Sequence, residues 1–206
     1  MSTGILGTKI GMTQIFDETG TAIPVSVIEA GPCPIISVKS MLRHGYEAIQ
    51  IGYLASPPKK VNKPFGGHFY KNNMTPMKYL KEYKTNQSEN YDIGVYITVE
   101  NFYKNQLVNV SGITIGKGFA GHQKRHNFSR GPKTHGSRNY KSPGSIGAGT
   151  NPARVLPKTR MAGHYGAKKT SIRKLKVIQV DAKSNILLIK GSIPGKPGSI
   201  VSITPS

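Results

Sequence analysis

The sequence predicts a mainly-β protein built around a closed or nearly closed β-barrel. About eight short runs alternate in polarity or are rich in β-branched residues, turn residues separate them, and little of the chain has a helical pattern. A stretch rich in glycine, proline and basic residues interrupts these runs after residue 115. We therefore expect a barrel with a small inserted region and a long, extended and irregular central extension.

The N-terminal residues predict a pair of strands. Residues 4–30 contain two apolar runs, and Asp17–Gly20 supplies turn residues between them. Along the second run Ile23, Val25 and Val27 alternate with smaller or polar residues. This is the pattern of a strand with one face turned to a core.

Further strands are expected on either side of a polar segment. Residues 34–40 and 46–54 have strand composition, and Pro57 and Pro58 end the second run. Residues 57–76 are rich in Pro, Gly, Asn and Lys. A short helix is predicted over residues 76–84, where helical spacing is kept by Met77, Leu80 and Lys81.

The remaining strands lie on both sides of the glycine-rich stretch. They are expected at residues 93–99, 107–116, 175–181, 186–191 and 199–204, with turns at Asp181–Asn185 and Pro194–Gly198. We predict that residues 1–115 and 170–206 form the barrel domain, with an insertion at about residues 57–92. Residues 116–169 form the extended segment.

Charge is distributed unevenly along the chain. There are 29 Lys and Arg against 9 Asp and Glu, for a net charge of +20. No acid lies between residues 101 and 180, a window that holds 16 Lys and Arg. So large a charge repels itself in a compact state, and it indicates a polyanionic partner, either nucleic acid or an anionic membrane surface.

The sequence argues against a membrane or secreted protein. Its longest apolar runs are only a few residues, such as residues 186–189, which is too short for a transmembrane helix. The N-terminal residues lack the pattern of a signal or transit peptide. Cys33 is the single cysteine, so no internal disulfide is expected, and a reducing compartment fits.

One segment imitates a nucleotide-binding motif. Residues 116–121, GKGFAG, match G-x-G-x-x-G directly after a predicted strand. The dinucleotide site also needs a helix after the glycines and an acid roughly 20 residues further on. Here Gly131 and Pro132 interrupt any helix early, and the next acid is Asp181. The glycines are expected instead to let the backbone turn sharply and approach phosphates closely.

A metal site is not expected either. His122 and His126 have the i, i+4 spacing of helical metal ligands, but a zinc site needs a third ligand, and none is near in sequence. Cys33 lies between two prolines and is expected to be a small packing residue. No nucleophile, base and acid can be assembled in a motif context, so neither cofactor nor catalysis is predicted.

The basic residues after residue 115 are spaced, not blocked, and aromatic side chains lie among them. This pattern suits an extended chain that runs between many phosphates, with rings that stack on unpaired RNA bases. For Phe119 and Phe128 a role as hydrophobic anchors stays equally open. The predicted RNA-binding residues are Lys117, His122, Lys124, Arg125, His126, Arg130, Lys133, His135, Arg138, Lys141, Arg154, Lys158, Arg160, Lys168 and Lys169.

The whole chain resembles a known family, that of the universal third protein of the large ribosomal subunit (ribosomal protein L-three) in its bacterial and plastid form. The segments GTKIGMTQIF, GFAGHQKRHNF, HGSRNYKSPGSIG and MAGHYG are similar to that family's. Its core signature is matched in register by Phe102, Asn109, Gly112, Thr114, Gly116, Lys117, Gly118, Gly121 and Arg125. The pattern is most similar to cyanobacterial and chloroplast versions.

The resemblance implies a β-barrel of the translation-protein type, without catalysis, that binds 23S-type RNA and neighbouring proteins of the large subunit. It implies early binding near the 3′ end of that RNA, and an extension that penetrates the RNA towards the peptidyl transferase centre. The residues expected at the tip are Gly147, Ala148, Gly149, Thr150, Asn151, Pro152 and Arg154. A chloroplast ribosome is the implied location, with a bacterial cytoplasm as the alternative.

Two other functions compete with this one. An enzyme that depends on a metal or a nucleotide would need a carboxylate near His122, His126 or the glycines, and the sequence has none there. A protein that compacts nucleic acid nonspecifically remains the alternative. It would be expected to carry a lysine-dense terminal tail, whereas the basic tract here is internal.

Overall fold

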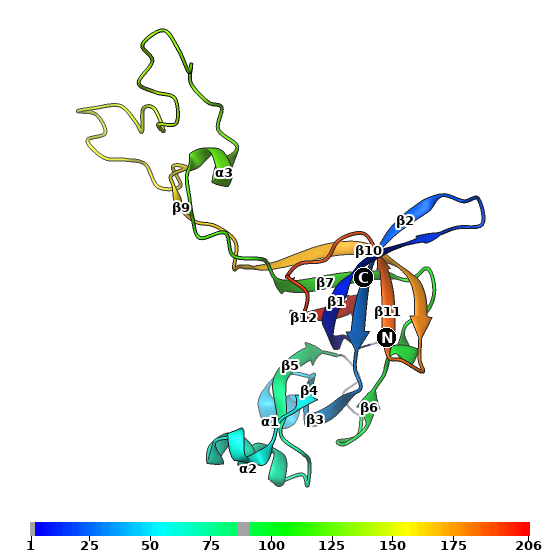
Figure 1. Cartoon of the computed structure of the whole chain (residues 1–206). Helices are drawn as coiled ribbons and strands as arrows, with labels where there is room; N and C mark the ends of the chain where they lie inside the picture. Colours follow the sequence, from blue (N-terminus) through cyan, green and yellow to red (C-terminus); the bar gives the residue numbers. More distant parts are fainter. Residues whose placement is uncertain (1–2, 86–90) are drawn as a thin grey trace. The chain divides into compact units, whose positions relative to one another are not determined.

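The structure is a computed structural model that describes residues 3–85 and 91–206 (Figure 1). The chain divides into two compact units. Unit 1 comprises Met1–Ile113 and Lys169–Ser206, and unit 2 comprises Thr114–Lys168.

Unit 1 contains a closed antiparallel barrel with the strand order β1-β12-β7-β10-β11-β2. Because β1 pairs with both β12 and β2, the ring has no open side. Alternate side chains of the strands point inwards, including Val108 and Val110 of β7 and Leu187 and Ile189 of β11. The prediction of a mainly-β protein is confirmed. The strands are β1 (Ile5–Phe16), β2 (Ala22–Ala30), β7 (Leu107–Ile113), β10 (Lys169–Asp181), β11 (Ile186–Lys190) and β12 (Ile200–Pro205).

A second antiparallel sheet, with the order β5-β4-β3-β6, shares its core with the barrel. One cluster of buried side chains includes Ile35, Ile51 and Tyr83 from this sheet and Ile5 and Ile203 from the barrel. Full burial of each large aliphatic side chain contributes about 1.5–3 kcal/mol, so this shared core ties the two sheets together. The strands are β3 (Cys33–Lys39), β4 (Ala48–Ala55), β5 (Met77–Lys84) and β6 (Tyr96–Ile97).

The helix predicted over residues 76–84 is wrong, because this segment is strand β5. It pairs with β4 from Met77↔Ala55 to Lys84↔Ala48, and that ladder satisfies its backbone groups. Met77 and Tyr83, on one face, are buried, whereas Lys78 and Lys84 are exposed. Packing against β4 therefore decided the structure over the local helical spacing. The strand predicted at residues 93–99 is reduced to the two residues of β6.

The polar segment after Pro57 contains a helix that the sequence did not reveal. It holds η1 (Pro58–Lys60) and α2 (Lys63–Tyr70), and Phe69 of α2 is fully buried against Ile36 and Met77. The other short helices of unit 1 are α1 (Met41–His44) and η3 (Val99–Asn101). The predicted insertion at about residues 57–92 includes residues 86–90, which lie outside the described residues. No helix in the described part of the chain is long and apolar enough to cross a membrane.

Candidate nucleic-acid interface

Unit 2 begins and ends as two chain segments that run side by side in opposite directions. β8 (Phe119–Ala120) pairs with β9 (Gly163–His164). Backbone hydrogen bonds continue the pairing, from Lys117 N to Tyr165 O at 2.8 Å and from Thr114 N to Lys168 O at 3.0 Å. These backbone bonds fix the base of unit 2, and the Thr114 hydroxyl adds a donation to the Lys168 carbonyl oxygen at 3.2 Å.

A short helix next to this base holds the returning chain. In α3 (His122–His126), Arg125 donates from Nη1 to the Met161 carbonyl oxygen at 2.7 Å. His126 Nε2 lies 3.0 Å from the same oxygen. Gly163 passes so close that an added Cβ would lie 2.6 Å from Arg125 Nη1. A side chain at residue 163 would therefore force the Arg125 guanidinium to shift from its place beside the Met161 carbonyl oxygen.

Three cations surround one aromatic ring in unit 2. The Nζ atoms of Lys133 and Lys141 lie 5.7 and 5.6 Å from the centroid of the Tyr140 ring, and the Arg130 guanidinium lies at 6.0 Å. Arg130 also donates to the Tyr140 hydroxyl at 3.3 Å. Gln123 Nε2 donates to the Tyr140 carbonyl oxygen, which joins this cluster to α3. The structure thus brings three cations, which are spread over residues 130–141 of the sequence, close to one ring.

The structure assigns different roles to Phe119 and Phe128. Phe119 is 80% exposed, so within unit 2 it is available for stacking. Phe128 is half-buried, and its ring centroid lies 5.6 Å from that of His122 and 6.0 Å from that of His126. Phe128 therefore anchors α3, and the i, i+4 histidines face an aromatic ring.

Unit 2 has almost no core of its own. Ala120 is its one buried residue, and every residue from 141 to 161 is exposed. The predicted tip residues lie within this exposed stretch, where Gly147 has φ +157° and Ala153 has φ +60°. The exposed apolar side chains here include Ile146, Val155 and Leu156. A segment that buries so little surface has little to offset its ordering entropy of about 1–2 kcal/mol per residue.

All predicted RNA-binding residues except Lys169 belong to unit 2, while Lys169 begins β10 in unit 1. Because unit 2 has no Asp or Glu, its cations have no carboxylate within the unit to neutralise them. The structure brings some of them together around α3, where Lys124, Arg130 and Lys141 help line an open pocket of about 400 Å³. It leaves Arg154 and Lys158 on the exposed stretch apart from that cluster.

The predicted RNA-binding residues end at Lys169 and leave out other cations of the acid-free window between residues 101 and 180. Arg173, Lys174 and Lys176 on β10 are also exposed. Their signal was available, since no acid precedes Asp181 there. Lys9, in contrast, does not lie on the surface. It is buried, and its ammonium donates to the carbonyl oxygens of Ile193 and Gly195 at 3.0 and 2.9 Å.

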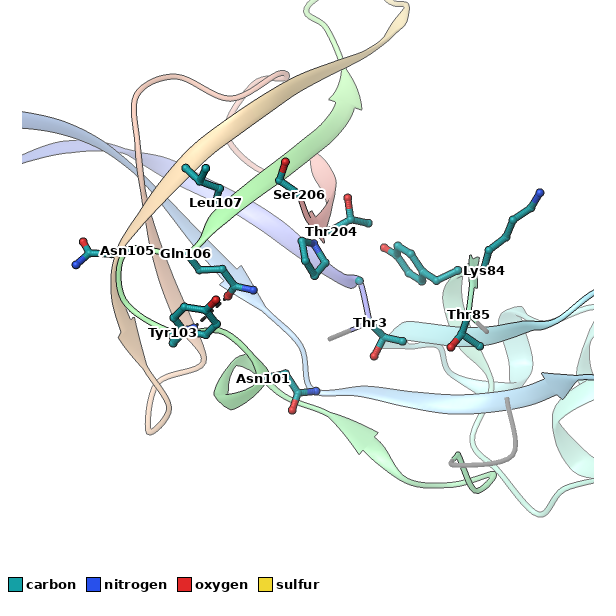
Figure 2. A pocket seen from close by; sticks show the side chains of 13 residues that line it. Thr3, Lys84, Thr85, Asn101, Tyr103, Asn105, Gln106, Leu107, Thr204 and Ser206 are labelled. Atoms are coloured by element: carbon teal, nitrogen blue, oxygen red, sulfur yellow. Dashed lines mark hydrogen bonds between the residues drawn. The ribbon is translucent and has the colours of Figure 1, made fainter. Parts of the chain in front are cut away.

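Unit 1 has a larger pocket, of about 1150 Å³, between the start of β1, the end of β5 and the start of β7 (Figure 2). Its polar side chains are amides, hydroxyls and a lysine, among them Asn101, Asn105, Thr204 and Lys84, and Leu107 and Pro205 add apolar surface. None of the described residues that line it has a carboxylate, imidazole or thiol side chain. The described residues also contain no group of three or more His, Cys, Asp or Glu that could hold a metal ion.

These features define a class: a mainly-β protein that combines a closed barrel with a basic, carboxylate-free unit that has almost no core. Comparison with known proteins identifies the family. The sequence model of the family described as Ribosomal protein L3 matches residues 82–185. This chain belongs to the ribosomal protein L3 family.

Relatives match over the full length. The large ribosomal subunit protein uL3c of the diatom Phaeodactylum tricornutum is 55% identical over 206 residues, which cover 100% of both chains. The uL3 proteins of the cyanobacteria Gloeothece citriformis and Trichormus variabilis are 58% and 56% identical, over 100% of this chain and 98% of theirs. The predicted resemblance to the bacterial and plastid form of the family is confirmed.

Proposed function

We propose that this chain is a structural constituent of the large ribosomal subunit and that it binds the RNA of that subunit directly, mainly through unit 2. One observation carries the proposal. Unit 2 exposes many Lys and Arg side chains and contains no Asp or Glu. Phosphates would supply the missing negative charge, and folded RNA would supply the packing surface that unit 2 lacks.

The contacts fall into two kinds. Lys and Arg side chains neutralise phosphates, which positions the chain without reading sequence. Exposed rings such as Phe119 can stack on unpaired bases. The Lys117 ammonium lies 4.9 Å from the centroid of the Tyr165 ring, so this aromatic is already paired with a cation that can reach a phosphate. Such a surface needs neither a cofactor nor a catalytic group.

Family membership supports the finer proposals. We infer that the chain helps to nucleate subunit assembly near the 3′ end of the RNA. The tip, Gly147–Pro152 with Arg154, would lie near the peptidyl transferase centre. Other large-subunit proteins would be its neighbours. The relatives come from a diatom plastid and from cyanobacteria, so we propose a plastid or bacterial ribosome, with the plastid preferred.

Co-sedimentation tests the proposal. The tagged chain should sediment with large ribosomal subunits at moderate salt and leave them only at high salt. Purified DNA of the same length as the subunit RNA serves as the comparison, because a nonspecific compacting protein would bind both equally. Failure to sediment with the subunit, or equal binding to DNA, would contradict the proposal.

A further inference from the structure

The hairpin formed by β1 and β2 extends past the strands that flank it in the barrel. β12 pairs with β1 only over Ile5–Thr8, and β11 pairs with β2 only over Val25–Glu29. The β1–β2 ladder itself continues to Phe16↔Ala22. Residues 10–24, here called the hairpin arm, therefore have no strand along either outer edge among the described residues (Figure 1, blue). Unpaired edges of this kind are open to another chain.

One face of the hairpin arm carries apolar side chains that are open to solvent, with Gln14 as the polar residue among them. Met12 and Phe16 are 51% and 64% exposed. Their cross-strand neighbours on the same face include the exposed Ala22 and Pro24, opposite Phe16 and Gln14. Ile10, at the register shift between Lys9 and Gly11, is 49% exposed. Exposed apolar side chains gathered on one element in this way mark an interaction surface.

The charge of this region is opposite to that of the rest of the chain. Residues 10–38 contain Asp17, Glu18 and Glu29 and no Lys or Arg, in a chain whose net charge is +20. The Asp17 carboxylate accepts hydrogen bonds from Thr19 and Thr21, and the Thr19 bond in particular lowers its pKa, so it is ionised. Lys190 is the one cation that contributes to this lowering, and it does so least.

The apolar side chains and the acidic turn together indicate what kind of molecule can bind the hairpin arm. Phosphates would be repelled by Asp17 and Glu18, and RNA offers little to cover Met12 and Phe16. A second copy of the chain that docked through the same hairpin arm would bring the same acids against these. A positively charged protein satisfies both features, because its aliphatic surface can cover the apolar face while its cations approach the acidic turn.

We propose that the hairpin arm is a protein-docking site, occupied by a basic protein of the same ribosomal subunit. The proposal rests on the proposed function, since it places this chain in that subunit. Unit 2 would then bind RNA while the hairpin arm binds protein, so one chain joins the two components of the particle.

Site-specific photocrosslinking in purified large subunits tests the proposal. A benzophenone amino acid replaces Phe16 in one variant and Phe119, in unit 2, in a second. We expect the probe at position 16 to crosslink to a single basic subunit protein, identified by mass spectrometry, and the probe at position 119 to crosslink to RNA. A crosslink from position 16 to RNA or to a second copy, or none at all while position 119 reacts with RNA, would overturn the docking site alone. Absence of both variants from the subunit would overturn the proposed function and the docking site with it.

Binding between this chain and the crosslinked protein, purified, gives the second readout. Phe16→Ser should raise the Kd by roughly tenfold or more, because a central aromatic contact is lost. Phe16→Leu should retain most of the affinity, and Glu18→Lys should weaken binding mainly at low salt. Leu42→Ser is the matched control, since Leu42 is 99% exposed on α1, outside the hairpin arm. Equal effects of Phe16→Ser and Leu42→Ser would contradict the proposal.

Discussion

The Tyr83 hydroxyl on β5 lies 2.7 Å from Ser202 Oγ on β12 and donates to the Ile5 carbonyl oxygen on β1 at 3.2 Å. This one side chain therefore joins the second sheet to two strands of the barrel. Gly4 passes against its ring, since an added Cβ at residue 4 would overlap Tyr83. Burial raises the pKa of Tyr83, so the phenol stays protonated and able to donate.

Tyr83→Phe should lower the free energy of unfolding by about 1–2 kcal/mol, because the Ile5 and Ser202 oxygens lose a buried partner. For a unit of this size, that corresponds to a decrease in Tm of roughly 3–6 °C. The control is Tyr46→Phe, which removes an exposed hydrogen bond to Glu82 and should change Tm much less. Thermal denaturation of both variants checks this, and equal losses would contradict the linking role of Tyr83.

Sequence patterns were sufficient for the barrel strands and for β3 and β4 of the sheet beside it, and insufficient for β5 and α2. The barrel strands alternate clearly and are bounded by turns, so local signals and tertiary packing agree. At β5, Met77, Leu80 and Lys81 keep helical spacing, yet pairing with β4 overrides it. At α2, the glycines and polar residues conceal a helix that depends on burial of Phe69 against Ile36 and Met77. Contacts that distant in sequence leave no local signature.

The same limit applies to the candidate interface. Charge and composition could predict which stretch binds RNA, because the missing acids are visible in the sequence. They could not predict that Arg125 donates to the Met161 carbonyl oxygen, 36 residues away, or that three cations surround Tyr140. They also could not predict that Lys9 is buried and donates to two carbonyl oxygens.

Cys33 should be almost unreactive in the folded protein. It is fully buried, and burial raises the pKa of its thiol from 9.0 to about 12. At pH 8 the thiolate fraction is then about 1,000 times smaller than for an ordinary thiol, so reaction with a thiol reagent should be slower by at least roughly that factor. The folded pKa lies above the unfolded one, so the associated stability is present below about pH 9 and is lost as pH rises towards 12.

Two measurements check the behaviour of Cys33. The rate of thiol labelling at pH 8 should rise steeply when denaturant unfolds the chain. In the unmodified protein the free energy of unfolding should fall above about pH 9, and Cys33→Ala should remove about 1.4 kcal/mol per pH unit of that fall. Fast labelling of the native protein, or an unchanged alkaline slope in Cys33→Ala, would show that Cys33 is accessible.

Free protein should be cleaved first in unit 2. Lys141 and Arg160 lie at the ends of a stretch in which every residue is exposed, whereas Lys176 lies in β10, which pairs with β7 and β11. Cleavage needs local unfolding, and that costs least where no apolar surface is buried. Limited trypsin digestion followed by mass spectrometry should give cuts at Lys141 and Arg160 before any at Lys176. The reverse order would mean that unit 2 is stable without RNA.

Binding to large-subunit RNA should weaken steeply with salt. Each neutralised phosphate contributes a slope of roughly −0.7 to −0.9 in log affinity against log salt. Lys124→Ala, which changes an exposed residue of unit 2, should therefore reduce the slope by about one unit or less. Lys71→Ala is the control, because Lys71 is equally exposed but follows α2 in unit 1. Filter binding at several salt concentrations measures both, and a flat dependence would contradict an electrostatic interface.

The last prediction separates anchoring from function within unit 2. The flanks Lys117–Lys141 and Arg160–Lys168 carry most of the cations, whereas Gly147–Leu156 is exposed and has one charge, Arg154. Deletion of Ala148–Ala153 should therefore leave incorporation into the subunit nearly intact, because few phosphate contacts are lost. If the tip lies near the peptidyl transferase centre as proposed, the deletion should alter peptide-bond formation, tRNA accommodation or sensitivity to drugs that bind that centre. Arg154→Ala should have the same effect more weakly.

Purified subunits with full-length or shortened protein allow the comparison. Unchanged translation and drug response at equal occupancy would make the tip a spacer, and loss of incorporation would show that the tip itself anchors the protein.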